Sequence, residues 1–449
     1  MGITLKSNYK LSDAILFVPL IFLPFSGLPL NSGEFSDYNP PLINILFRNE
    51  IWLSLSVIVN IPKILKYKWN NNKNNKIILK NVLILPILIF ISILIPTLIM
   101  PLISDNYLNE LSITKTYSLF QILLWPIYGY SLFVSFQNKL SNEIIKKYFF
   151  KILTIVNLPN VLILITIFLF WISNSPIYQY SIVEGPFLLF APGLRFQGVG
   201  SNPNVAAYAS IISFIGLGYL ITNSEKFFKK NIFIDFLLLF FALGDLLTIY
   251  FSGVRSALLS IFISFLFIIL IYIRNNKLPK LIYLFSIFLI ISYLILNFDN
   301  FYISFYNLIN RGTRGGRFEL WNYYLSNGFQ YFLGLGKNYL NVIEPPQFIG
   351  GIRSNMGVLS PHNYFIDSWL SGGFFALLIS IYRFIGLINL FKLKLNYIFT
   401  INLAIIFSVI DANVVASVGG INPDLFFIIS YMLLNIENSK KIENKSEIK

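Results

Sequence analysis

The sequence IILKNVLILPILIFISILIPTLIMP, residues 77–101, decides the class of fold. It carries one charged side chain, Lys80, and as a helix it can cross the bilayer core of about 30 Å, which needs roughly 20 residues. Backbone groups in lipid must bond within their own segment, so such continuous Leu/Ile/Phe-rich runs favour helices over strands. Similar runs predict an all-α membrane protein with about twelve transmembrane helices, at about 12–30, 44–65, 77–101, 117–137, 148–172, 205–222, 232–251, 257–273, 280–298, 363–390, 398–417 and 420–436.

The composition of the whole chain agrees with this class. It is 56% hydrophobic and 12% charged, with a mean hydropathy of +0.69, too apolar for a water-soluble protein of 449 residues. It has no cysteine, which excludes disulfides and thiolate metal sites. We predict a single polytopic membrane domain over residues 1–449, with membrane lipids and not nucleic acid as its surroundings.

The distribution of positive charge orients this domain. With the N-terminus in the cytoplasm, nine of the 34 lysines and arginines face outward and the rest face inward. This is the positive-inside pattern, and an even number of spans returns the C-terminus to the cytoplasm. The largest outer connections are then an external loop at 173–204 and a long external loop at 299–362, between spans nine and ten. The first run, 12–30, is interpreted as a retained helix although it holds three prolines.

The outward cations are mostly arginines. They are Arg48, Lys115, Arg195, Arg255, Arg311, Arg314, Arg317, Lys337 and Arg353. Seven of the chain's nine arginines lie here, against about 2.4 expected if residue type were indifferent to side. Guanidinium offers a planar bidentate fork and is weakly hydrated, which suits phosphate oxygens at a partly desolvated site. The outer face is therefore predicted to bind phosphate.

Two short motifs place single arginines at the start of spans. Residues 194–204, LRFQGVGSNPN, close the first loop, where Asn202 or Asn204 can cap the next helix and Arg195 lies at the lipid boundary. Residues 251–259, FSGVRSALL, form a tight turn that brings Arg255 close to a helix N-terminus, which favours an anion. The simpler alternative for both arginines is interfacial anchoring.

The long loop concentrates the remaining candidates. Arg311, Arg314 and Arg317 recur at a spacing of three and would share one face of a helix, where Arg317 and Trp321 could stack. Gly312, Gly315 and Gly316 instead favour an irregular basic loop. The later Gly334-Leu-Gly336 is interpreted as a turn, because it lacks the strand–turn–helix setting of a nucleotide fingerprint.

The loop ends on His362, the one histidine of the chain, followed by Asn363, which could orient it. A neutral imidazole can abstract a proton near neutral pH, and an incidental loop histidine is the alternative. Three nearby carboxylates, Glu319, Glu344 and Asp367, could be the base instead. Asp245 and Asp411 fall within spans, where an unpaired carboxylate is costly, so we expect both to face the bundle interior.

The order of these motifs resembles the O-antigen ligase and O-antigen polymerase superfamily of bacterial membrane glycosyltransferases. The residues that carry the resemblance are Arg195 with Asn202-Pro-Asn204, Ser252-Gly-Val-Arg255-Ser256, Gly316-Arg317-Phe-Glu-Leu-Trp321, and His362-Asn363 with Gly372-Gly373. In ligases the histidine is followed by Asn, then nine further residues, and then the motif Gly-x-x-Gly, Gly-x-x-Thr or Gly-x-x-Tyr. The corresponding positions here are Gly373 and Ala376, so the last residue of the motif departs from the ligase pattern.

The resemblance implies a fold and a reaction. The fold would be a GT-C-like helical bundle in the bacterial inner membrane, with its active site facing the periplasm. The donor would be an undecaprenyl-diphosphate-linked glycan and the acceptor a glycan or lipid A core, with no metal or cofactor, inversion at the anomeric carbon, and other polysaccharide assembly proteins as possible partners. Arg195 and Arg255 match the arginines assigned to the diphosphate, and His362 matches the histidine that activates the acceptor.

Two other classes of function stay open on the sequence. A lipid-linked oligosaccharide flippase or transporter would place polar groups at the midplane of several helices and usually contains internal repeats. A non-catalytic scaffold for polysaccharide assembly would not need the outward arginines. We predict His362, Arg255 and Arg195 as catalytic residues and Arg317, Arg314, Arg311, Trp321, Asn204 and Asn363 as substrate-binding residues.

Overall fold

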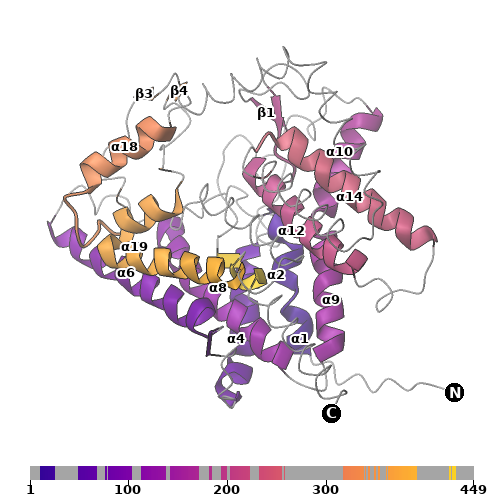
Figure 1. Cartoon of the computed structure of the whole chain (residues 1–449), viewed down its shortest axis with the longest axis horizontal. Helices are drawn as coiled ribbons and strands as arrows, with labels where there is room; N and C mark the ends of the chain where they lie inside the picture. The colour runs from indigo at the N-terminus through magenta and orange to yellow at the C-terminus, as the bar shows by residue number, and fades with distance from the viewer. Residues whose placement is uncertain are drawn as a thin grey trace. The chain divides into compact units, whose positions relative to one another are not determined.

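The computed structural model describes residues 11–25, 49–67, 76–77, 79–103, 113–137, 142–170, 182–184, 194–199, 203–222, 232–254, 257, 317–337, 339, 342–343, 348–349, 352–353, 361, 363–391, 424–425 and 427–430. Within these ranges the regular secondary structure is helical apart from two short antiparallel strand pairs (Figure 1). The predicted helical class is confirmed. The spans predicted at 257–273, 280–298 and 398–417 lie outside the described residues.

The described elements follow in chain order. They are α1 (Leu11–Ile15), α2 (Val18–Ile21), the 3₁₀ turn η1 (Leu23–Phe25), α4 (Asn49–Lys66), the π-helix η2 (Leu79–Ile84), α6 (Leu85–Ile103), α8 (Ile113–Gln137), α9 (Asn142–Ile155), α10 (Leu158–Phe170), β1 (Ile182–Glu184), β2 (Leu194–Phe196), α12 (Pro203–Thr222), α14 (Ile232–Ser252), α18 (Arg317–Gly328), β3 (Phe348–Ile349), β4 (Ile352–Arg353) and α19 (Tyr364–Phe391).

Three of the described helices have the length and apolar composition to cross a membrane. They are Leu79–Leu102, Tyr148–Ile167 and Tyr364–Gly386, and they coincide with the spans predicted at 77–101, 148–172 and 363–390. Shorter apolar helices at Ser12–Ile21, Ile122–Phe136, Pro203–Leu217 and Phe236–Ser252 overlap four more predicted spans. The total of twelve and the orientation stay predictions.

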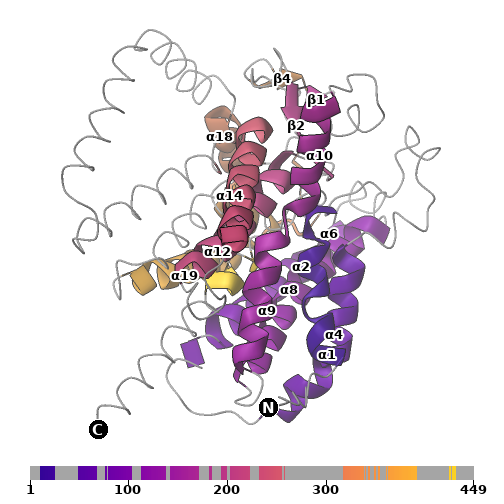
Figure 2. The same ribbon diagram turned by 90° about the vertical axis from the view of Figure 1, so that its right-hand side faces the viewer.

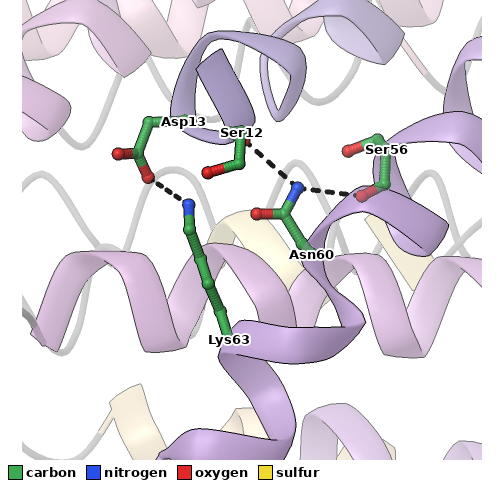
Figure 3. Close-up of polar contacts among 5 residues, drawn as sticks. All are labelled: Ser12, Asp13, Ser56, Asn60 and Lys63. Atoms are coloured by element: carbon green, nitrogen blue, oxygen red, sulfur yellow. Dashed lines mark hydrogen bonds and ion pairs between the residues drawn. The ribbon is translucent and has the colours of Figure 1, made fainter. Parts of the chain in front are cut away.

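The first apolar run is broken where a single helix was predicted. Residues 11–25 form α1, α2 and η1, with Pro19 in the first turn of α2 and Pro24 in η1. Proline has no N–H and cannot continue a helical hydrogen-bond ladder, which accounts for the short pieces. Figure 3 shows how the run is fastened to α4: Lys63 forms an ion pair with Asp13, and the Asn60 amide donates to the carbonyl oxygens of Ser12 and Ser56.

The chain divides into two compact units, which are described separately. The first comprises Met1–Ile87, Phe120–Ile261 and Ala416–Lys449, and the second Leu88–Leu119 and Phe262–Val415. In the first unit α12 packs against both α9 and α14 (Figures 1 and 2). A Cβ on Gly216 of α12 would lie 2.6 Å from the Thr154 backbone nitrogen of α9, so this glycine lets the two backbones approach closely.

In the second unit α18 and the segment after it pack against α19. The shared core is Leu320, Tyr324, Leu335, Tyr339, Ile343, Ile366 and Leu370. The backbone N–H groups of Leu335 and Gly336 donate to the carbonyl oxygens of Leu370 and Ser371 at 2.7 and 2.8 Å. The chain turns just before this segment, where the Gly334 N–H donates to the Tyr331 carbonyl oxygen at 3.1 Å, and Gly334 and Gly336 have left-handed φ values of 80° and 78°.

The helix α19 is folded in two, and this differs from the single span predicted at 363–390. Gly373 has φ 69° and ψ −164°, and the side chains on its two sides meet: Ser380 Oγ donates to Ser368 Oγ at 2.9 Å, and the rings of Phe365 and Phe384 lie 5.4 Å apart. Residues 12 apart in a straight helix would be separated by about 18 Å. Figure 1 shows the two arms at an angle. Both ends of α19 therefore lie on the same side of the kink at Gly373.

Candidate functional site

The segment that carries Arg195 is anchored in the core of the first unit. Arg195 lies on β2, opposite Val183 of β1. The next residue, Phe196, is fully buried in a cluster with Leu164, Ile167, Ala206 and Phe251. The backbone of this segment therefore has a fixed place, whereas the Arg195 side chain lies outside the described residues.

After β2 the chain turns into α12. Gly198 has φ 68°, and the Val199 N–H donates to Asn160 Oδ1 of α10 at 2.9 Å. The helix begins at Pro203, whose fixed φ suits a first helical position. Asn202, the other predicted cap, lies outside the described residues. Asn204, predicted to bind substrate or to cap, is the second helical residue and is not the cap.

The segment that carries Arg255 begins where α14 ends. Ser252 Oγ donates to the Ile249 carbonyl at 2.7 Å, and the Gly253 N–H donates to the Tyr250 carbonyl at 3.2 Å. Gly253 has φ 63°, a left-handed conformation that commonly ends helices, so the predicted turn is confirmed. Arg255 itself lies outside the described residues. Phe251 belongs to the same buried cluster as Phe196, so the two arginine-bearing segments leave one common core.

In the second unit a hydrogen bond ties α18 to the residue before His362. Trp321 Nε1 donates to the Pro361 carbonyl oxygen at 2.7 Å. Arg317 is the first residue of α18, with its side chain outside the described residues, and Arg311 and Arg314 precede the helix, also outside them. The predicted stacking of Arg317 on Trp321 stays a prediction. Trp321 also has a structural role, because its indole N–H holds the backbone carbonyl of Pro361, the residue next to His362.

Asn363 determines where α19 begins. Its Oδ1 accepts hydrogen bonds from the backbone N–H groups of Phe365 and Ile366 at 3.0 and 3.2 Å, the pattern of a helix N-cap. The Asn363 side chain is 8% exposed. His362 lies outside the described residues, between Pro361 and Asn363. Both of its neighbours are held, so the backbone reaches His362 from two fixed points.

A cluster of titratable side chains lies just beyond this cap. Tyr339 donates its hydroxyl to Asp367 Oδ1 at 2.7 Å, and the Asp367 side chain is fully buried. The rings of Tyr324 and Tyr339 meet edge to face at 6.3 Å. Burial and the nearby carboxylate of Asp367 raise the pKa of Tyr339 and of Tyr324. The sequence offered Asp367 as an alternative general base. Its carboxylate is buried and already accepts the Tyr339 hydroxyl, an arrangement that suits a structural role near the start of α19.

Lys337 approaches the same carboxylate from the segment after α18. Its backbone N–H donates to Thr97 Oγ1 of α6 at 2.9 Å, which fixes this part of the chain on α6. Burial lowers the pKa of Lys337 to about 7, and the charge of Asp367 opposes that shift. Among the described residues, Lys337 is the amine beside the candidate helix start whose charge changes near neutral pH.

The fold of α19 brings one further cation to this place. Arg383 is 1% exposed, and its Nη1 donates to the Tyr364 hydroxyl at 3.4 Å, two residues after His362. The sequence pattern predicts one straight helix over 363–390 and so counts Arg383 among the inward-facing cations. The signal for the fold was present in the adjacent Gly372 and Gly373, and a Cβ on Gly373 would lie 2.3 Å from the Phe332 carbonyl oxygen.

Residues 237–381 match the family model for O-antigen ligase. The match confirms the resemblance to the O-antigen ligase and polymerase superfamily. No curated protein and no solved structure matches the chain.

The O-antigen ligase match begins within α14 and ends in the second arm of α19. It therefore contains Arg255, Arg317 and His362, while Arg195 precedes it and Arg383 follows it. Together with the apolar helices, the O-antigen ligase match indicates a multi-pass membrane protein and supports a glycosyltransferase-like ligase or polymerase activity.

Proposed function

We propose that this protein transfers a glycan from an undecaprenyl-diphosphate carrier to an acceptor hydroxyl on the outer face of the bacterial inner membrane. The observation that carries the proposal is that one O-antigen ligase match contains both Arg255 and His362. The packing of Phe196 and Phe251 in one cluster supports a common role for the Arg195 and Arg255 segments.

The proposed reaction is a single displacement at the anomeric carbon. His362 takes the proton of the acceptor hydroxyl while the acceptor oxygen forms its bond to that carbon. The bond from the carbon to the diphosphate oxygen breaks, and the electron pair leaves with the lipid diphosphate. Arg195 and Arg255 neutralise the charge that develops on this leaving group, which is where preorganised donors lower a barrier most. Arg311, Arg314, Arg317, Trp321, Asn204 and Asn363 are proposed to position donor and acceptor, and attack from the opposite side inverts the carbon.

Reconstitution with a lipid-diphosphate glycan tests this function. The protein in proteoliposomes is given the donor with and without a lipid A core acceptor. Ladders of growing glycan indicate a polymerase, and single addition to the core indicates a ligase. Absence of any new glycosidic bond, with donor and acceptor both present and the protein folded, would contradict the proposal.

A flippase remains the second candidate, favoured by one observation. The first unit buries Asp245, Asn157 and Asn160 completely within apolar helices, the kind of intramembrane polar group that transporters use. Movement of a fluorescent lipid-linked glycan between leaflets, without glycan transfer, would support this alternative. Transfer with no movement would exclude it.

A further inference from the structure

A line of buried polar side chains crosses the first unit between α14 and α10. Asn157 Nδ2 donates to Asp245 Oδ1 at 2.9 Å and to Thr248 Oγ1 at 3.2 Å, and Asn160 Nδ2 donates to Asn157 Oδ1 at 2.9 Å. All four side chains are fully buried. The prediction that Asp245 faces the interior is thereby confirmed, while Asp411 lies outside the described residues.

This line leaves the helices and ends on the loop that carries Arg195. Asn160 Oδ1 accepts the Val199 N–H at 2.9 Å. Each link donates toward Asp245: Val199 to Asn160, Asn160 to Asn157, and Asn157 to the carboxylate. Asp245 Oδ1 accepts from the Asn157 amide nitrogen, and the Asn157 amide oxygen is left to accept from Asn160 Nδ2, so these two bonds fix the orientation of both amides. The oxygen of Asn160 is thereby the group that faces the loop.

The loop is shaped to receive that oxygen. Gly198 has φ 68°, and a Cβ at this position would lie 2.1 Å from Asn160 Oδ1. A side chain larger than hydrogen would therefore displace the Asn160 amide. The contact joins residues 39 positions apart, and the strand β2, with Arg195 at its centre, ends two residues before the turn.

Stability alone gives little reason for such a line. Burying polar groups costs free energy that their hydrogen bonds only offset, and well-packed apolar side chains often replace them without loss. What a buried polar network adds is a fixed geometry, because each hydrogen bond restricts the orientation of its donor and its acceptor. Here the geometry is fixed at a loop end and not only between helices.

We propose that Asn160, oriented through Asn157 by Asp245, is a positioning residue that holds the Arg195 segment in place for the donor's diphosphate. The inference rests on the proposed role of Arg195. The network does not touch the reacting atoms. It sets the backbone from which Arg195 extends, so its loss weakens binding of the diphosphate and leaves the acceptor side unchanged.

The experiment measures binding of undecaprenyl diphosphate to the full chain in lipid nanodiscs. Asn160→Ala removes the acceptor for the Val199 N–H, and we expect about tenfold weaker binding, the usual scale for one buried hydrogen bond. Amide hydrogen exchange at residues 197–199 should rise in the same variant. Ser210→Ala is the matched control, because the Ser210 hydroxyl is buried but bonds only within α12, to the Ala206 carbonyl, and its binding should stay unchanged.

Two conservative pairs separate positioning from other roles. Asp245→Asn keeps an acceptor for Asn157, so it should bind nearly as well as the unchanged protein, whereas Asp245→Leu should show the loss seen with Asn160→Ala. Equal loss in both would mean that the charge itself is needed, and would overturn the proposal. Should Asn160→Ala fail to fold, Gly198→Ala perturbs the same contact from the loop side and should weaken binding similarly.

A double variant distinguishes this inference from the proposed function. If Asn160 acts through Arg195, Asn160→Ala should cause no further loss in an Arg195→Ala background. Losses that multiply would assign the network to general stability and overturn the inference. Normal binding by Arg195→Ala alone would instead refute the diphosphate role of Arg195, and then raised exchange at Val199 in Asn160→Ala would still show that the contact exists.

Discussion

The Arg195 segment, residues 194–199, and the His362 segment, residues 361–367, both precede a helix but are held in different ways. In the first, the Val199 N–H bonds to Asn160, a side chain 39 positions earlier in the chain. In the second, Asn363 caps its own helix through the N–H groups two and three residues later. The first segment is held by an amide side chain of a neighbouring helix, whereas the second combines the cap of its own helix with bonds from Trp321 to Pro361 and from Tyr339 to Asp367.

This difference predicts where each segment is sensitive to change. The position of Arg195 depends on α10 and α14, so substitutions distant in sequence should weaken the hold on the diphosphate. The position of His362 depends on Asn363 and on Trp321, which bonds to Pro361, so its sensitive positions lie in the second unit, whereas those of Arg195 lie in the first. Substitutions around the Arg195 segment should therefore affect diphosphate binding, and substitutions around the His362 segment should affect proton abstraction.

The largest expected effect comes from His362→Ala. Removing a general base typically lowers the rate by about 10²–10⁴-fold, so glycan transfer should fall on this scale. The measurement is initial transfer rate in proteoliposomes at equal protein content. Turnover close to that of the unchanged protein would exclude His362 as the general base and would favour Glu319 or Glu344 in that role.

The next effect comes from Arg255→Lys. The charge is kept but the bidentate fork is lost, so transfer should fall at least about tenfold, since hydrogen bonds to charged groups contribute about 1.5–3 kcal/mol. Arg48→Lys is the matched control, because Arg48 lies near the outer end of the span predicted at 44–65 and belongs to none of the motifs. Normal turnover in Arg255→Lys would favour interfacial anchoring as the role of this arginine.

A smaller effect is expected from Trp321→Phe. The aromatic ring stays but the N–H donor to the Pro361 carbonyl is lost, a change of about 1 kcal/mol, or roughly fivefold in rate. The loss should appear in kcat and not in the affinity for undecaprenyl diphosphate, because the bond holds the His362 segment. A loss confined to donor affinity would instead favour the predicted stacking of Trp321 with Arg317.

The smallest effect is a pH dependence of stability that stems from Lys337. With a folded pKa near 7, the amine loses its proton while the unfolded chain still holds it up to about 10.5. The unfolded state then binds more protons between these values, so stability rises with pH across that window. Lys337→Met should reduce the gain in Tm between pH 7 and pH 9. An equal gain in the variant would show that other groups cause it.

Much of the fold followed from local patterns in the sequence. Apolar runs predicted most of the described helices, although not α18, which lies within the predicted long loop, and glycine predicted the turn at Gly253. The burial of Asp245 followed from the cost of a carboxylate in lipid. These features depend on neighbours in sequence or on solvent alone, which a sequence shows directly.

The features that escaped prediction depend on contacts between distant residues. Hydropathy gives the length of α19 but not the fold at Gly373 that brings Arg383 to Tyr364. Asn157 and Asn160 lie within the apolar run predicted at 148–172 and gave no separate signal, although they flank Pro159 at the break between α9 and α10. Their partners on α14 become visible only in the packed structure.

Affinity for undecaprenyl diphosphate, measured on the Arg195→Ala, Arg255→Lys and His362→Ala variants in nanodiscs, tests the central claim most directly. Both arginine variants should bind the lipid diphosphate at least about tenfold more weakly, whereas His362→Ala should bind it normally although it no longer transfers glycan. Normal binding by both arginine variants, or an equal loss in all three, would contradict the separation of diphosphate binding from proton abstraction.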